Sequence, residues 1–487
     1  MVPLRRPGIG RERDIPKNEI GNLKMADKEH QFDRTRGNLE RRLGPFDSTM
    51  MMVGIVIGSG IFLTTGIMAQ SLPSVSLLLL AWLAGGLITL AGAFLFAELG
   101  ASMPEAGGLY VYLSEAYGPL TGFLYGWITF LVYMSGSVAG LAVAFAEYFG
   151  HFFPFLSTNN YLFKTGWCSI SRGQLVAVAA ILLISAINYV GVAFGKLIQN
   201  IFTVIKIGTV ISFVVLGFTI GKGSSIDFSI NPMNFSLGQV LTGFGIVMVA
   251  VFWTFDGWNN VSFVAGEIKN PKKNLPLALI LGTLVISVLY VLINVVYFKA
   301  LPVNEMAGTV AVAESASSAL FGRTMTGLFS GAILVSIFGA LNGTIFVGAR
   351  VYYAMAKDKL FFGKAAVIHP RFKTPSFAIV LQAIWACLLA LSGTFKQLFT
   401  YVIFISIVFW IGAAAAVYTL RKKHPDLPRP YKTWGYPVTP AVFIIISTGI
   451  LINTLFTAPV ESLASLGFIV LGLPMYFYWK RKSREES

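Results

Sequence analysis

The chain has 487 residues, of which 55% are hydrophobic and only 12% are charged. This composition excludes a soluble globular protein and predicts an all-α polytopic membrane protein. The net charge of +15 comes from basic residues in short segments beside apolar runs. That distribution is typical of membrane topology and argues against a nucleic-acid partner.

The cysteine and histidine content excludes several kinds of chemistry. The two cysteines, Cys168 and Cys387, are too few for a disulfide framework or a zinc cage. The four histidines all fall outside the middles of the apolar runs, so we expect no intramembrane metal or haem site. We find no Ser/His/Asp or Cys/His constellation, and we therefore expect neither an enzyme nor a cofactor.

The first 47 residues are polar and mixed in charge, and they contain no apolar core of signal-peptide length. We expect residues 1–47 to form a disordered cytoplasmic tail. Twelve later runs are apolar and long enough, at about 20 residues each, to span a bilayer. These predicted spans are 48–71, 76–98, 119–150, 173–193, 197–221, 238–266, 276–298, 324–355, 376–393, 395–418, 438–457 and 462–480.

The basic residues predict which side of the membrane each loop occupies. An even number of spans returns the C-terminus to the side of the N-terminus. With that side inside, 30 Lys and Arg fall inside and six outside, when Arg350, Lys396 and Lys480, near the ends of their predicted spans, are counted with the adjacent loops. Because cytoplasmic loops are enriched in Lys and Arg, we expect a plasma (inner) membrane protein with both termini in the cytoplasm. We divide the rest of the chain into a transport core (48–418), a basic connection (419–437), two additional spans (438–480) and a C-terminal tail (481–487).

The first span is interrupted at Gly58, Ser59 and Gly60. Glycine costs about 1 kcal/mol of helix stability relative to alanine, so we expect the helix to break there. A break inside a bilayer frees N–H and C=O groups that lipid cannot satisfy, and it must be buried in protein or line a wet cavity. The alternative is that Gly54 and Gly58 form a small-residue face for close helix packing.

A second interruption lies in the sixth span, at Phe252–Asn259. In the predicted topology the two interrupted spans run in opposite directions, at corresponding places in two blocks of five. We therefore predict an inverted repeat of five plus five spans with discontinuous helices 1 and 6, plus two additional helices. Half-helix N-termini attract anionic groups and loose carbonyls attract cations, and an amino acid carries both charges.

Two ionisable residues lie at membrane depth. Asp256 could face a ligand's ammonium group or a cationic side chain, or it could form a structural pair with a lysine or with backbone N–H groups. Lys206 lies too deep in the fifth span for its side chain to reach water. Its ammonium could bind carbonyls of the broken first helix, carry a proton, or serve only as scaffold.

Aromatic and amide side chains surround the second interruption. Trp253 could close over a small ligand. For a membrane aromatic, however, packing against neighbouring helices is the commoner role, and packing is also the alternative for Phe255 and Trp258. Asn259 and Asn342 could bind a ligand or could only hydrogen-bond neighbouring helices.

Five motifs distinguish the core. They are Gly58-Ser-Gly-Ile-Phe62, Asp256-Gly-Trp-Asn259, Glu267-x-x-Asn-Pro271, Phe96-Ala-Glu-Leu99 and Asn200-Ile-Phe-Thr-Val-Ile-Lys206. Together they resemble the L-amino acid transporter family of the amino acid–polyamine–organocation superfamily. The resemblance covers about residues 45–480 and looks most like a prokaryotic single-chain member.

The resemblance implies a leucine-transporter-type fold and sodium-independent amino acid transport, typically by obligatory exchange. It implies that residues 58–60 bind the substrate carboxylate, and that the carbonyls of Val56, Trp253 and Asp256 bind the amine. The candidate substrate-binding residues are therefore Val56, Gly58, Ser59, Gly60, Trp253, Phe255, Asp256 and Asn259.

By the same resemblance, Trp253 is a gate over the substrate, and Lys206 stands where sodium-coupled relatives bind a cation. A heteromeric member that takes cystine and basic amino acids shares the aromatic-Asp-Gly-Trp pattern around Asp256, which leaves cationic substrates open. Eukaryotic light chains use an outer-loop cysteine before span four to bind a glycoprotein heavy chain, and Cys168 falls in that loop. Because the rest of the sequence looks single-chain, we expect Cys168 to be an unpaired thiol and expect no heavy-chain partner.

The leading hypothesis is a sodium-independent exchanger of neutral L-amino acids, with cationic ones left open, that works by alternating access in the lipid bilayer. One alternative is a proton-coupled symporter in which Lys206 or Asp256 titrates. A second alternative, from another class, is a sensor that binds amino acids without moving them.

Overall fold

The structure is a computed structural model that describes residues 39–164, 169–228, 236–309, 311–392 and 395–485. The described residues from Leu39 onward form one compact unit. Most of the tail predicted at 1–47 therefore lies outside the described residues.

The prediction of an all-α protein is confirmed, since the described strands form only one short antiparallel hairpin, β1 (Tyr161–Lys164) with β2 (Ser169–Ser171). The short helices are α5 (Leu109–Tyr117), α12 (Val303–Met306), α13 (Val312–Phe321), η2 (Pro154–Leu156) and η4 (Gly363–Ala366). The long helices and the segments continuous with them are α2 (Pro45–Val56), α3 (Gly60–Ser71), α4 (Val75–Ser102), α6 (Pro119–Ile128), η1 (Thr129–Tyr133), α7 (Met134–Phe152), α8 (Arg172–Val190), α9 (Val192–Thr219), α10 (Leu237–Phe255), η3 (Asn260–Glu267), α11 (Pro271–Ala300), α14 (Arg323–Lys357), α15 (Ser376–Ser392), α16 (Phe395–Lys423), α17 (Val438–Thr457) and α18 (Pro459–Glu485).

Eleven stretches of the described chain are helical, long and apolar enough to cross a membrane, where the sequence predicts twelve. The predicted span that is not among these eleven is the ninth, 376–393, which forms α15 with 17 residues. At 1.5 Å per residue such a helix covers roughly 26 Å, slightly less than the bilayer's hydrocarbon core of about 30 Å.

The helical unit extends beyond several predicted boundaries. It begins before residue 48, because α2 starts at Pro45 and the fully buried Leu43 donates its N–H to the Glu267 carbonyl over 2.9 Å. At the other boundaries α16 continues to Lys423 and α18 to Glu485. Hydropathy marks where the chain leaves the apolar layer, whereas backbone hydrogen bonds let a helix continue into polar surroundings.

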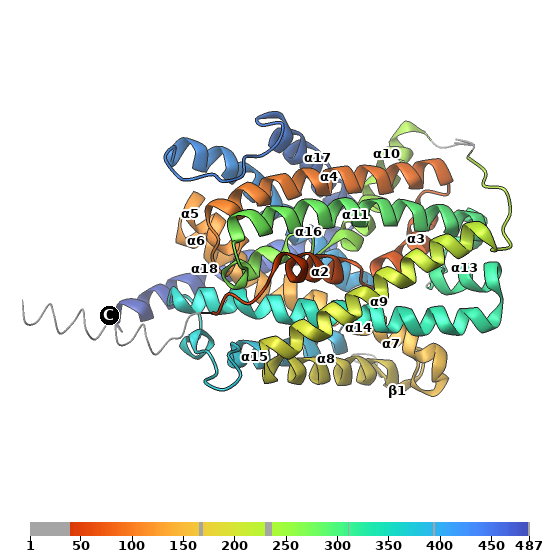
Figure 1. Cartoon of the computed structure of the whole chain (residues 1–487), viewed down its shortest axis with the longest axis horizontal. Helices are drawn as coiled ribbons and strands as arrows, with labels where there is room; N and C mark the ends of the chain where they lie inside the picture. Colours follow the sequence, from red (N-terminus) through yellow and green to blue (C-terminus); the bar gives the residue numbers. More distant parts are fainter. Residues whose placement is uncertain (1–38, 165–168, 229–235, 310, 393–394, 486–487) are drawn as a thin grey trace, which may run out of the picture. The chain divides into compact units, whose positions relative to one another are not determined.

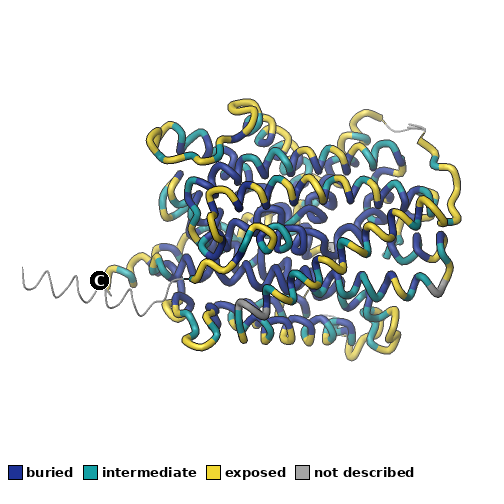
Figure 2. Tube along the Cα trace, in the orientation of Figure 1, coloured by how far each residue is buried: buried dark blue, intermediate teal, exposed yellow. Residues whose placement is uncertain are grey.

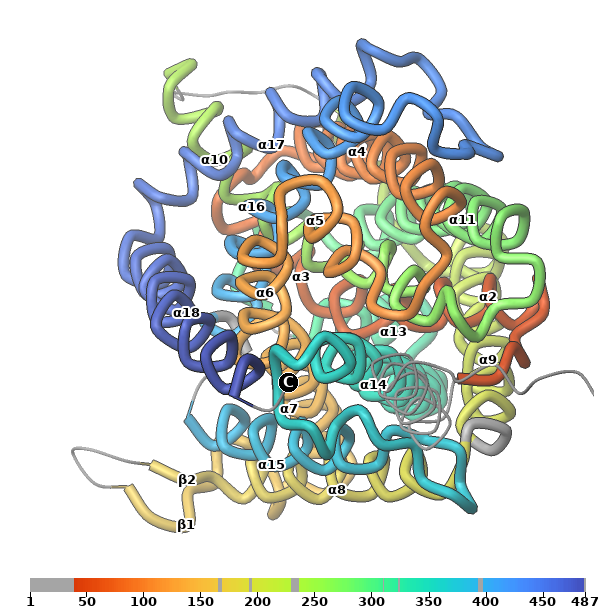
Figure 3. Tube along the Cα trace, turned by 90° about the vertical axis from the view of Figure 1, so that its left-hand side faces the viewer, coloured from red at the N-terminus to blue at the C-terminus, as the bar shows by residue number. Residues whose placement is uncertain are grey.

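The long helices lie side by side along one axis, with the broken first span inside and the last two spans at the edge (Figures 1 and 3). Burial follows this arrangement. In the first span (45–71), 89% of the apolar 18-residue stretch is buried, whereas in the last span (459–485) only 22% of the corresponding stretch is buried. Exposed residues accordingly lie along the outward faces of the peripheral helices (Figure 2). Those outward faces are apolar, as expected of surfaces that meet lipid.

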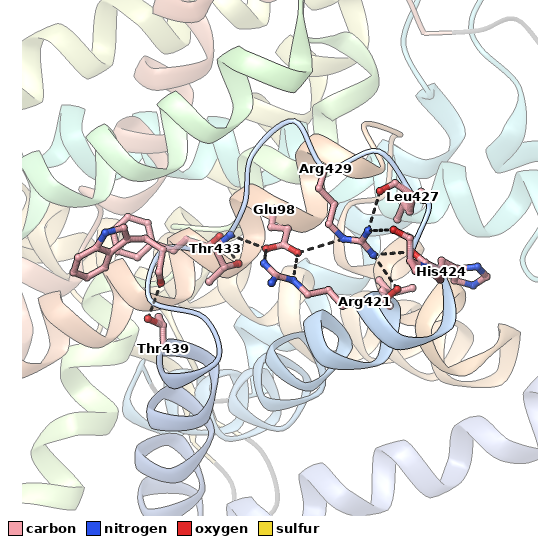
Figure 4. Close-up of polar contacts among 11 residues, drawn as sticks. Glu98, Arg421, His424, Leu427, Arg429, Thr433 and Thr439 are labelled. Carbon is pink, nitrogen blue, oxygen red and sulfur yellow. Dashed lines mark hydrogen bonds and ion pairs between the residues drawn. The ribbon is translucent and has the colours of Figure 1, made fainter.

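A buried carboxylate joins α4 to the connection between α16 and α17 (Figure 4). The Glu98 carboxylate accepts hydrogen bonds from Nε and a terminal nitrogen of Arg421 at 2.8 and 2.6 Å, and from the Thr433 backbone N–H at 2.6 Å. Arg429 lies 3.6 Å away as a second cation. We call this end of the helices, which also holds α5 and the end of α18, the Glu98 end; the opposite end, with α13 and the β1–β2 hairpin, is the hairpin end.

Candidate functional site

The first span breaks between α2 and α3. Helix α2 ends at Val56, the Gly58 N–H turns back to the Val56 carbonyl at 2.7 Å, and α3 begins at Gly60. Gly60 lies against the second broken span so closely that a Cβ there would sit 2.6 Å from the Thr254 Cα. The break is therefore buried in protein, as an interruption at membrane depth must be.

The second break follows α10. The helix ends at Phe255, the chain is extended at Asp256 (ψ 146°), and Gly257 has a φ of +93°, in the region that favours glycine. A 3-10 segment, η3, then begins at Asn260. Glycine is required at 257 for a second reason, because a Cβ there would lie 2.4 Å from a methyl carbon of Ile55.

The two breaks meet in space. The hydroxyls of Thr64 and Thr254 lie 3.0 Å apart. The Tyr290 hydroxyl, from α11, lies 2.8 Å from the Val56 carbonyl and 3.1 Å from the Thr254 carbonyl, so its proton is shared between the two broken helices. Sequence reasoning missed Tyr290, whose only signal is a tyrosine in the middle of an apolar span.

We expect Tyr290→Phe to lower transport about fivefold to tenfold, because a buried acceptor that loses its donor costs about 1–3 kcal/mol. The measurement is the initial rate of amino acid exchange in proteoliposomes, normalised to folded protein. Tyr297→Phe is the matched control, since Tyr297 is on the same helix and its buried hydroxyl has no hydrogen-bond partner among the described residues. Equal rates for the two variants would contradict the bridging role.

Lys206 lies beneath the first break. Its ammonium, on α9, donates to the Gly54 carbonyl at 2.6 Å and to the Ile57 carbonyl at 2.9 Å, and the side chain is fully buried. The Ser336 hydroxyl also lies 3.2 Å from the Ile57 carbonyl. The Lys206 side-chain nitrogen and the Ser336 hydroxyl thus bind carbonyls at the end of α2 that the break frees from helical partners.

A small cavity of about 20 Å³ lies between the two breaks. This is room for roughly one water molecule. Of the predicted substrate-binding residues, Val56, Gly58, Ser59, Gly60, Trp253 and Asp256 line it. Four further lining residues were not predicted and come from three helices: Ile55, Ser137, Leu141 and Thr344.

The cavity has one end suited to an anion and one suited to a cation. Gly60, the first residue of α3, lines the cavity, and the N–H groups at the start of a helix lack the usual helical acceptors. The buried Ser59 hydroxyl has no hydrogen-bond partner among the described residues. The C-terminal ends of α2 and α10 supply carbonyls and the negative end of each helix dipole. The Val56 carbonyl already accepts from the Gly58 N–H and from Tyr290, so a ligand ammonium would share that oxygen.

Asp256 presents its carboxylate to the cavity. One oxygen accepts from the Tyr133 hydroxyl at 3.0 Å, and the other lies 3.4 Å from the Ser137 hydroxyl. Among the described residues, the ion pairs do not include Asp256. The Gly257 backbone N–H is a further hydrogen-bond partner. Of the two structural partners that the sequence allowed, the described contacts of Asp256 thus include a backbone N–H group but no lysine.

Trp253 forms one wall of the cavity. Its ring centroid lies 5.8 Å from that of Phe399 on α16, and a Cβ on Gly140 would approach the ring to 3.1 Å. The indole is thus held between α7 and α16, beside the cavity.

Two predicted substrate-binding residues, Phe255 and Asn259, are not part of the cavity lining. The Phe255 ring packs against Tyr290 and Trp82, with centroids 5.1 and 6.4 Å apart, because the helix places it on the face opposite Trp253. Asn259 is buried beside Tyr133, whose hydroxyl lies 3.5 Å from the Asn259 oxygen. Cys168, which we expect to be an unpaired thiol rather than a link to a heavy chain, lies outside the described residues.

Contacts close the structure on both sides of the cavity. Toward the Glu98 end, the fully buried Arg350 donates to Glu267, the last residue of η3, at 2.8 Å. Further along, Tyr110 donates to Asp358 at 2.6 Å, and burial raises the pKa of Asp358. Toward the hairpin end, the Tyr148 hydroxyl donates to the Phe62 carbonyl at 3.0 Å, which joins α7 to α3.

The family model for amino acid permeases matches residues 43–478. The chain belongs to the amino acid permease family. The permease is 32% identical over 453 residues to the serine/threonine exchanger SteT of Bacillus subtilis, covering 91% of this chain and 98% of that protein. It is 30% identical to the human large neutral amino acids transporter small subunit 2, covering 92% and 82%, and 30% identical to the human b(0,+)-type amino acid transporter 1, covering 90% and 88%.

Membership confirms the family resemblance that the sequence motifs indicate. The permease is a multi-pass membrane transporter of amino acids in the amino acid–polyamine–organocation superfamily, and it is not an enzyme. The superfamily implies a leucine-transporter-type fold.

Proposed function

We propose that this permease is a sodium-independent exchanger of L-amino acids, and that the substrate's charged backbone groups bind between the two helix breaks. The observation that carries the proposal is the meeting of the breaks, with Tyr290 hydrogen-bonded to both and the Lys206 ammonium bound to carbonyls of the first. Three relatives with about 30% identity that transport or exchange amino acids support it.

The substrate carboxylate would bind the N–H groups at the start of α3 and the Ser59 hydroxyl. A helix N-terminus combines free N–H donors with a positive dipole end, which makes it suited to a carboxylate. The ammonium would bind the carbonyls of Val56, Trp253 and Asp256. A neutral or cationic side chain would then extend along Ser137 and Thr344, toward the Trp253 wall.

Lys206 explains why sodium is not required in this proposal. A sodium site at the first break would use the carbonyls of broken helix ends. Here the Lys206 ammonium occupies the Gly54 and Ile57 carbonyls at hydrogen-bond distance. A permanent internal cation would perform the structural role of the ion without being transported.

Alternating access would open the two sides of the cavity in turn. We propose that the Glu98 end faces the cytoplasm, because the loops there contain most of the Lys and Arg residues. Opening toward the cytoplasm would separate the Glu267–Arg350 pair, and opening toward the outside would separate α3 from Tyr148. The cavity must widen in either case, since about 20 Å³ is too small for an amino acid.

We propose that the permease works as a single chain, without a heavy chain.

Purified permease in proteoliposomes tests the mode of transport. An exchanger takes up labelled amino acid only when unlabelled amino acid is inside, and replacing external sodium with choline leaves the rate unchanged. Uptake into empty vesicles driven by an inward proton gradient would instead establish proton symport, which the Asp256 carboxylate at the cavity wall favours as the second candidate. Binding without any flux would establish the sensor.

We expect Asp256→Asn to reduce uptake of lysine and arginine more than that of leucine and serine, by about tenfold, because it removes the negative charge beside the substrate without changing shape. Competition by each amino acid against one labelled neutral substrate measures the difference. Asp358→Asn is the matched control, since this carboxylate also accepts from a tyrosine hydroxyl but lies outside the cavity. An equal loss for cationic and neutral substrates would reject the side-chain role.

A further inference from the structure

An exposed aromatic segment lies at the hairpin end, between α7 and α8. Five apolar side chains in it are about half exposed or more: Phe153 (53%), Phe155 (67%), Tyr161 (47%), Leu162 (51%) and Phe163 (47%). All four residues of β1 are exposed, although alternate residues of a strand point to opposite faces. Neither face of β1 is therefore covered by the described part of the chain.

The base of the segment is fixed, so its exposure is not that of a loosely attached loop. The Arg172 N–H donates to the Asn160 carbonyl at 2.7 Å, and the Asn160 side chain donates to the Pro154 carbonyl at 2.6 Å. Gly173, in the first turn of α8, lies so close to Thr158 that a Cβ would meet its backbone at 2.7 Å. The hairpin is thus held at one angle to the helices.

That angle directs the hairpin away from the helices. Seen from the Glu98 end, β1 and β2 project sideways past α8 and α15, at the lower left of Figure 3. The aromatic segment starts directly after α7, and β2 ends directly before α8, so the hairpin lies at the ends of two spans, where they leave the apolar layer. The exposed leucines of α8, such as Leu182 (52%) and Leu183 (55%), continue the same apolar surface below it.

Basic side chains flank the aromatic rings. The Arg172 guanidinium carbon lies 3.8 Å from the centroid of the Phe155 ring, and the exposed Lys164 ammonium lies 5.1 Å from the Tyr161 centroid. Aromatic rings with a neighbouring cation fit the interfacial layer of a bilayer, where rings insert among the glycerol groups and cations meet lipid phosphates.

We propose that residues 153–164, which include β1, form a lipid-binding surface that lies in the headgroup layer of the leaflet at the hairpin end. Its ligands are phospholipids of that leaflet, with Phe155 and Phe163 among the acyl-chain ends and Lys164 beside a phosphate. This surface anchors the outer ends of α7 and α8. Helix α7 contributes Ser137 and Leu141 to the cavity wall, so the anchor holds that wall at a constant depth.

Spin-label accessibility tests the proposal. A nitroxide is attached at Leu162→Cys in full-length permease in which Cys168 and Cys387 are replaced by serine, reconstituted into phosphatidylcholine or phosphatidylglycerol vesicles at low protein density. Collision with oxygen, which concentrates in the bilayer, is compared with collision with a water-soluble nickel chelate. Leu182→Cys on the apolar face of α8 is the lipid control, and Asp426→Cys on an exposed loop is the aqueous control.

We expect the label at 162 to favour oxygen over nickel, with a ratio closer to that of 182 than to that of 426, in both lipids. A ratio equal to that of 426 would overturn the proposal by placing the hairpin in water. Dipolar broadening between labels would overturn it in favour of a second copy of the chain. Phe155→Cys provides the same test if the Leu162→Cys protein does not reconstitute.

Discussion

We expect Gly60→Ala to abolish most amino acid transport, with a fall of about tenfold or more. A Cβ at residue 60 would lie 2.6 Å from the Thr254 Cα and 2.6 Å from the Thr254 hydroxyl oxygen. The backbone atom cannot rotate away, so one broken helix must move from the other. Overpacking of this kind costs about 1–3 kcal/mol, and the displaced groups are those proposed to bind the carboxylate.

The measurement is the exchange rate in proteoliposomes, with folded protein quantified by size-exclusion chromatography and thermal unfolding. Gly208→Ala is the matched control, because Gly208 is in a spanning helix and a Cβ there meets no heavy atom within 4 Å. Gly58→Ala should lose less, since its Cβ would meet the flexible end of Leu141 at 3.1 Å. A wild-type exchange rate in the Gly60→Ala variant would show that transport does not depend on the close approach of the two breaks.

Lys206→Met should also depress transport by about tenfold or more while leaving the folded yield unchanged. Methionine approximates the length of the lysine stem but cannot donate, so the Gly54 carbonyl loses its donor and the Ile57 carbonyl keeps only Ser336. A buried acceptor without a donor costs about 1–3 kcal/mol. Because these carbonyls flank the first break, we expect the loss to appear in the shape of the substrate site rather than in the global fold. Lys206→Ala should give the same result.

Lys299→Met is a closely matched control for Lys206→Met. The Lys299 ammonium also donates to a helix carbonyl, that of Gly217 at 2.8 Å, but at the far end of α9 and away from both breaks. Retention of full exchange by Lys206→Met, or an equal loss in both variants, would reject a specific role for the cation beneath the first break.

The sequence predicts the fold class and the position of both breaks because each depends on local composition. Gly58 and Gly60 weaken the first span, and Gly257 supplies the positive φ of the second. Hydropathy locates the spans but not the ends of the helices, which is why α16 and α18 continue past the predicted boundaries.

Only those residues of the cavity lining that belong to the two broken spans could be predicted from the sequence. Ser137 and Thr344 come from spans three and eight, and small hydroxyl residues of this kind are common in apolar helices and give no local signal. Phe255 was predicted to bind substrate from its neighbours in sequence, whereas the rotation of α10 turns its ring toward Trp82 and Tyr290. Which face a residue occupies next to a break depends on the tertiary packing.

Competition by blocked amino acids tests most directly whether broken-helix main chain binds the charged substrate backbone. The amino acid that exchanges fastest in proteoliposomes is labelled, and the unlabelled parent is compared with its N-acetyl and its carboxamide derivatives. We predict that each derivative competes at least about tenfold less well than the parent, because each loses one charge-assisted set of hydrogen bonds. Competition by either derivative as strong as that of the parent would contradict the proposed site.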